Sequence, residues 1–226
     1  HLPSQPLIHY AQVAYFNGSI DSSQKFFSML AEQAAQEHSS YWEGRALFGL
    51  AQAQLRGSEF ASARKTVERF RSLAANTKLS NTDDHIVDIG VLDARLQLLS
   101  GDAAAAYASA SGVLHAHGYF EGLRKMTMRE ALILASQAAL ESGHAGVALG
   151  LARDARTVAT LDSLTDTRSA YVGEARLAEA RALVAMGDSV GARAALDRAS
   201  VAVQIGGGRS HPLNQSIDSL RASLVR

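Results

Sequence analysis

Apolar residues recur along this chain at the spacing of one helix face, and a glycine follows each such stretch. An aliphatic side chain lies ten residues before each glycine, a mostly small one seven before, and a mostly apolar one three before. Offsets of three and four residues share one face of an α-helix, so each stretch predicts an amphipathic helix that ends at the glycine. The five glycines, about 40 residues apart, are Gly18, Gly57, Gly101, Gly143 and Gly187.

A second helix is predicted after each glycine. Five residues beyond every glycine the sequence has a small residue, Ser or Ala, and a further apolar stripe follows. Residue types that cap helix N-termini stand just after most of the glycines. These capping candidates are Ser19 or Asp21, Ser58, Asp102 and Asp188. Self-similarity at this period is typical of a stack of helical hairpins.

The pattern predicts an all-α chain of about five hairpins and one closing helix, within a single helical-repeat domain over residues 1–226. The three prolines lie near the ends, so the strongest helix breaker is absent from the long middle section. Three glycines at 206–208 predict a flexible joint before the closing helix. The expected hairpins cover residues 5–37, 40–76, 83–117, 122–160 and 167–204, and the expected capping helix covers 213–225.

These residues resemble the tetratricopeptide repeat family, in its long variety of about 42 residues seen in kinesin-light-chain-like repeats. The resemblance rests on the aliphatic and small positions, the helix-ending glycine, and the Gly-Asp pairs at 101–102 and 187–188. It implies a right-handed superhelix. The segment from Gly206 to Leu213 is similar to the tail of such repeats in bacterial multidomain proteins, where they follow a kinase or DNA-binding domain. That implies a regulatory role within a longer protein.

The composition of the chain limits the classes of partner that we expect it to bind directly. The 226 residues are 47% hydrophobic, and 22 basic residues balance 22 acidic ones. This balance argues against nucleic acid or an anionic membrane as a direct partner, because both favour a basic excess. The sequence has no cysteine and no apolar run long enough to cross a bilayer. We expect a cytoplasmic location, and an oxidising compartment such as the periplasm is also compatible. The first residue is His1, so we expect a fragment of a longer protein.

Two clusters of metal-binding residue types occur. Asp83, Asp84 and Asp88 are similar to the aspartate-rich box of all-α prenyl-transferring enzymes, but the spacing is one residue too long and no second box follows. His115 and His117, near Glu121, diverge on a helix and have no evident third ligand. A capping role at helix ends explains both clusters better. We therefore expect no catalytic residue, no metal and no cofactor.

The predicted interaction surface consists of two rows on the first helices of the hairpins, which line the concave side of such an array. A polar row lies six residues before each glycine and suits peptide amides or carboxylates. An apolar row lies nine before, and it either borders the groove or packs between helices. The expected site residues are Gln12, Phe48, Leu92, Arg95, Leu134, Gln137 and Arg181.

The expected function is a non-catalytic scaffold that binds a protein or peptide. The alternative is the ligand-responsive domain of a transcriptional activator, with a small-molecule effector in the groove.

Overall fold

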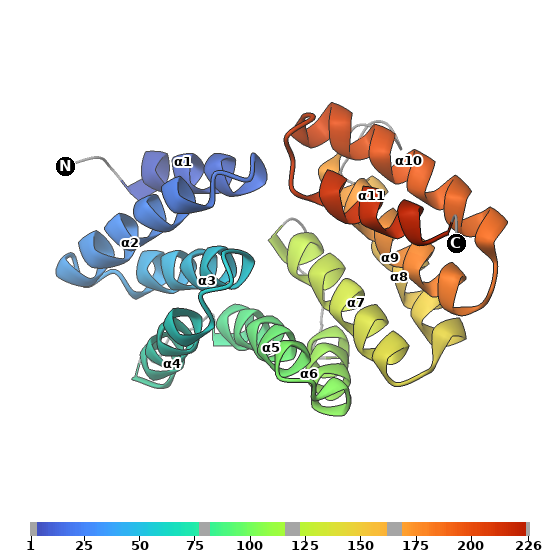
Figure 1. Cartoon of the computed structure of the whole chain (residues 1–226). Helices are drawn as coiled ribbons and strands as arrows, with labels where there is room; N and C mark the ends of the chain where they lie inside the picture. Colours follow the sequence, from blue (N-terminus) through green and yellow to red (C-terminus); the bar gives the residue numbers. More distant parts are fainter. Residues whose placement is uncertain (1–3, 77–81, 116–122, 162–168, 225–226) are drawn as a thin grey trace. The chain divides into compact units, whose positions relative to one another are not determined.

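The computed structural model describes residues 4–76, 82–115, 123–161 and 169–224. For residues 82–86 and 123–126 it describes the backbone only. Over these residues the chain is all-α, with eleven helices and no strand, which confirms the predicted class (Figure 1). The helices are α1 Ser4–Phe16, α2 Ile20–Gln36, α3 Ser40–Arg56, α4 Phe60–Asn76, α5 Thr82–Leu99, α6 Ala103–His115, α7 Leu123–Glu141, α8 Ala145–Leu161, α9 Ala170–Ala185, α10 Ser189–Gly207 and α11 Leu213–Ser223.

The chain divides within α5 into two compact units, His1–Leu92 and Asp93–Arg226, called unit 1 and unit 2 below. In unit 1, α2 packs against both α1 and α3, and α1 also contacts α3. In unit 2, α8 packs against α7 and α9, and α10 packs against α9 and α11. Consecutive odd-numbered helices, α7 with α9 and α9 with α11, touch as well. This packing of neighbouring helices is consistent with a helical repeat.

Each hairpin turn is built around one residue with left-handed backbone. Gly18, Gly101, Gly143 and Gly187 have φ between 77° and 79°. At each of these turns the next residue donates its backbone N–H to the carbonyl five residues earlier, as in Asp188 to Leu183 at 2.9 Å. This bond satisfies a carbonyl that the last turn of the helix leaves unpaired.

The second hairpin departs from the predicted alignment by one residue. Gly57 has φ −78°, and Ser58 takes the left-handed conformation with φ 62°. Glu59 donates to the Gln54 carbonyl at 2.8 Å, which is the same turn bond counted from Ser58. The repeat is therefore marked by a left-handed residue rather than by glycine, and Ser58 replaces Gly57 as the marker.

Alignment on the left-handed residues explains the small side chains. The residues seven before and five after the marker are fully buried in every hairpin. Seven before are Ala11, Ala51, Ala94, Ser136 and Ala180, and five after are Ser23, Ala63, Ala106, Ala148 and Ala192. The two positions face each other across the hairpin: the Ser23 hydroxyl donates to the Ala11 carbonyl at 3.1 Å, and the Ser136 hydroxyl donates to the Ala148 carbonyl at 2.8 Å.

The predicted N-caps are confirmed at two of four sites. Asp102 accepts from the Ala105 N–H at 3.0 Å, and Asp188 accepts from the Gly191 N–H at 2.8 Å. Ser19 makes no side-chain cap bond. Ser58 is no cap at all, because its left-handed backbone forms the turn.

The prediction of a flexible joint at the glycine run is wrong for two of its members. Gly206 and Gly207 belong to α10, and only Gly208 lies past the helix, with φ 85°. A Cβ on Gly206 would overlap the backbone nitrogen of Ala170 and would lie 2.7 Å from Ser169 Cα. Gly206 therefore lets the end of α10 pack against the start of α9.

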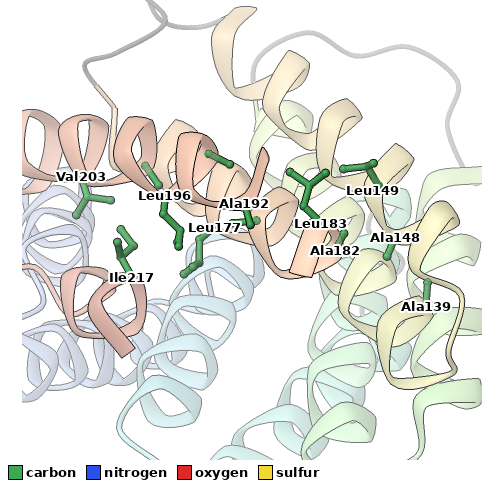
Figure 2. Packing of buried hydrophobic residues seen from close by; sticks show 13 residues of the cluster. Ala139, Ala148, Leu149, Leu177, Ala182, Leu183, Ala192, Leu196, Val203 and Ile217 are labelled. Atoms are coloured by element: carbon green, nitrogen blue, oxygen red, sulfur yellow. The ribbon is translucent and has the colours of Figure 1, made fainter. Parts of the chain in front are cut away.

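The core of unit 2 continues into the last helix. Ile217 of α11 is buried in one cluster with Leu177 of α9 and with Leu196 and Val203 of α10 (Figure 2). Exposed positions of α11 are polar or small, among them Gln215, Asp218 and Ser219. The helix thus covers the apolar surface of the last hairpin.

The strained backbone of Ser58 gives a testable result. A non-glycine residue in the left-handed region costs roughly 1 kcal/mol, so Ser58→Gly is expected to raise the free energy of unfolding by about that amount. Gly187→Ala is the reverse control and is expected to lower the free energy of unfolding. Its Cβ would meet no atom within 4 Å, so only the backbone strain changes. Urea denaturation measures both. A less stable S58G variant would contradict the assignment of the turn.

Candidate functional site

The corrected alignment completes the polar row. The residues six before each left-handed residue are Gln12, Gln52, Arg95, Gln137 and Arg181. Counting from Gly57 had put Ala51 at this position in the second hairpin; counting from Ser58 puts Gln52 there. All five side chains are reached by solvent. Gln12 and Gln52 lie in unit 1, on α1 and α3. Arg95, Gln137 and Arg181 lie in unit 2, at the same position of α5, α7 and α9.

On α9 the row reaches solvent from a helix that is otherwise largely enclosed. Between Val172 and Leu183 of α9, every residue is buried except Glu174 and Arg181. These two are seven residues apart, or about two helical turns, so they form one narrow polar stripe. The remaining faces of α9 pack against α7, α8, α10 and α11. A surface stripe of this kind on an enclosed helix is where α9 can contact another molecule.

The side chain of Arg181 is accessible to solvent and has a lowered pKa. Surrounding protein atoms desolvate the guanidinium and lower its pKa, while the carboxylate of Glu174 opposes that shift. The side chain is nevertheless exposed. An accessible guanidinium donates charge-assisted, often bidentate hydrogen bonds to carboxylate or carbonyl oxygens.

The other two members of the row in unit 2 make local contacts. Arg95 Nη2 lies 2.6 Å from Glu130 Oε1, which joins α5 to α7 through a partly buried ion pair. Gln137 Nε2 donates to Glu141 Oε1 at 3.2 Å along α7. Arg95 therefore has a structural role within unit 2, whereas Arg181 has no carboxylate within ion-pair distance among the described residues.

The apolar residues predicted for the groove are placed differently. Leu92 of α5 and Leu134 of α7 are buried and pack between helices. In the corrected alignment Phe48 belongs ten residues before its marker, with Ile8, and it is only partly exposed. The polar row is therefore not accompanied by an exposed apolar row.

Among the described residues of unit 2, the sequence pattern missed three buried charged side chains: Arg129 of α7, and Arg176 and Glu179 of α9. The Arg129 guanidinium lies 3.5 Å from the centroid of the Tyr171 ring, in a cation–π contact. Glu179 accepts from Arg153 Nε at 3.2 Å. One feature of the sequence could have revealed them: charged residues stand in helices made mostly of small and apolar residues. Charged side chains are seldom buried without partners, so such residues point to buried ion pairs or ring contacts.

The candidate metal clusters fall largely outside the described part of the chain. The side chains of Asp83 and Asp84 are among those excluded, as are His117 and Glu121. His115 Nδ1 lies 2.6 Å from the Ser111 carbonyl oxygen. Within the described residues, no three His, Asp or Glu side chains come close enough to share a metal ion.

No family model matches this sequence, and a search of curated proteins finds no match either. In the described part of the chain, every helix is too short or too polar to cross a membrane.

Proposed function

We propose that this chain is a non-catalytic interaction scaffold with a right-handed, tetratricopeptide-like superhelix that binds a protein or peptide through its polar row. The observation that carries the proposal is the side-chain chemistry at one repeat position. Gln or Arg occupies that position in all five hairpins and stays accessible, while its neighbours on α9 are buried. A position that is polar and accessible in every hairpin offers a partner one contact in each repeat.

The residue types favour an extended peptide segment. Glutamine offers both a donor and an acceptor to backbone amides, and arginine adds a charge-assisted bond to carboxylate or carbonyl oxygen. The regulatory role within a bacterial multidomain protein is part of the proposal, and its support is the resemblance of the repeats and of the segment after Gly206.

Arg181 gives the sharpest test, because its replacement breaks no ion pair among the described residues. Short random peptides displayed on phage are selected against the wild-type chain, and the best binder is then titrated by calorimetry. Loss of one charge-assisted hydrogen bond costs about 1.5–3 kcal/mol, so Arg181→Glu is expected to weaken binding by about tenfold to a hundredfold.

Arg198→Glu is the matched control, since Arg198 is exposed on α10 and the change in net charge is the same. It is expected to bind as the wild type does. Equal affinity of the two variants would overturn the proposed surface, and so would failure to select any peptide.

A further inference from the structure

The two side chains that reach solvent on the enclosed part of α9 carry opposite charges. Glu174 is partly exposed and Arg181 is exposed, and they stand thirteen and six residues before the left-handed Gly187. Among the described residues, neither forms an ion pair with another side chain. Seven residues of helix separate them, so their Cα atoms lie about 10 Å apart along α9.

Elsewhere in unit 2 the same two repeat positions pair with each other. Arg95 of α5 stands six residues before the left-handed residue of its hairpin, and Glu130 of α7 stands thirteen before that of the next hairpin. They are the repeat equivalents of Arg181 and Glu174. The Arg95 Nη2 and Glu130 Oε1 atoms lie 2.6 Å apart in an ion pair. The chain itself therefore shows that the first position takes a carboxylate and the second takes a guanidinium.

The corresponding partners are missing around α9. By the same repeat rule Glu174 would meet the position on α7 that Gln137 occupies, and Gln137 donates instead to Glu141 at 3.2 Å. On its other side, α9 contacts α11, whose one carboxylate, Asp218, pairs with Arg221 at 3.1 Å. In the described part of unit 2, Glu174 and Arg181 are thus left without the partners that their repeat equivalents have.

The surface between the two charges has no bulky side chain on the same face. Ala178 lies there, four residues after Glu174 and three before Arg181, and both intervals keep it on their side of the helix. The equivalent position of α7 is Leu134. The backbone of a bound segment can therefore lie close to α9 while its side chains reach the two charges.

Building on the function proposed above, we propose that the partner presents a basic side chain to Glu174 and an acidic side chain to Arg181. In the polyproline II conformation an extended segment rises about 3.1 Å per residue, with residues i and i+3 on one side and about 9 Å apart. Opposite charges three positions apart in a peptide thus match the separation along α9. Because each charge has its own partner, the order of the two also fixes the direction in which the peptide lies.

The test uses the best peptide selected on phage against the wild-type chain and measures its binding by calorimetry. We expect the selected peptides to contain Lys or Arg three positions from Asp or Glu. Glu174→Gln is expected to weaken binding of the best peptide about tenfold. Replacing the basic residue of the peptide with glutamine is expected to weaken binding to the wild type equally, and to have little further effect on E174Q. Circular dichroism checks that E174Q keeps its helix content.

Asp154→Asn is the matched control, because Asp154 is an exposed carboxylate on α8 and the change in net charge is the same. It is expected to bind the peptide as the wild type does. An unchanged affinity of E174Q overturns the dipolar site, and so does an equal loss in D154N. Losses from E174Q and from the altered peptide that simply add overturn it as well.

These outcomes are separate from those that test the proposed function. If R181E weakens binding while E174Q does not, the polar row remains the interaction surface and only the basic contact is removed. If no peptide is selected, or if R181E and R198E bind equally well, the proposed function fails and the dipolar site fails with it.

Discussion

Replacing Gly173 with valine is expected to lower the free energy of unfolding by about 3 kcal/mol or more. Gly173 is buried in α9 where that helix crosses α10. A Cβ at this position would overlap Cγ2 of Val203 and would lie 3.0 Å from the carbonyl oxygen of Ala199. The second contact is with backbone, so α10 must move away and the core between the two helices must open. Urea denaturation followed by circular dichroism measures the loss.

The control is Gly150→Ala in α8. Gly150 is exposed, and a Cβ there meets no atom within 4 Å. Alanine is the better helix former, so this variant is expected to gain about 0.5–1 kcal/mol. If G173V is too unstable to purify, Gly173→Ala keeps the overlap with Val203 and is expected to be less stable than the wild type. A G173A variant that gains stability as G150A does would contradict the contact between α9 and α10.

Periodicity along the sequence was sufficient to place the helices. The predicted hairpin at 167–204 corresponds to α9 and α10, which run from Ala170 to Gly207. Its turn was found because Gly187 and Asp188 are a helix-ending residue and an N-cap, and both act locally. The end of α10 was placed too early: the helix continues to Gly207, and Gly206 lies against the start of α9. That contact joins residues more than thirty positions apart and leaves no local signal.

The turn of the second hairpin shows why the site was only partly predicted. Glycine is the usual residue for left-handed backbone, and the sequence offers Gly57 one position too early. Anchoring the repeat there put Phe48 in the predicted groove and left out Gln52. The small residues could have corrected the alignment, because Ala51 and Ala63 fit the fully buried row only when Ser58 is the marker.

Burial of individual side chains was the part that the sequence could not supply. Leu92 and Arg95 lie three residues apart on α5, yet Leu92 is fully buried and Arg95 reaches solvent. A repeat offset specifies a direction around the helix, but the neighbouring helices decide which directions are closed. Helix α9 has neighbours on several sides, so only a narrow stripe stays open on it between Val172 and Leu183. The polar row coincides with that stripe on α9.

Reversing the charge of Glu179 is the second large effect that we expect. The Glu179 side chain is only 10% exposed, and its two oxygens lie 3.2 Å from Arg153 Nε and 3.7 Å from Arg156 Nη1. Glu179→Lys would place an ammonium group in this buried position beside two guanidinium groups. Since Arg153 is itself half exposed, its lost ion pair contributes little, and most of the cost comes from the buried charge. We expect a loss of about 3 kcal/mol or more in the free energy of unfolding.

Glu141→Lys changes the charge in the same way at the exposed end of α7. It is expected to alter stability by no more than about 0.5 kcal/mol, because a basic residue is favourable at a helix C-terminus. Adding Arg156→Glu to E179K restores an opposite charge to the buried lysine, so the double variant is expected to be more stable than E179K alone. If E179K and E141K unfold at the same urea concentration, the contact between α8 and α9 does not depend on Glu179. The ion pairs with Arg153 and Arg156 would then be incidental to the packing that holds α9, and with it Arg181, in place.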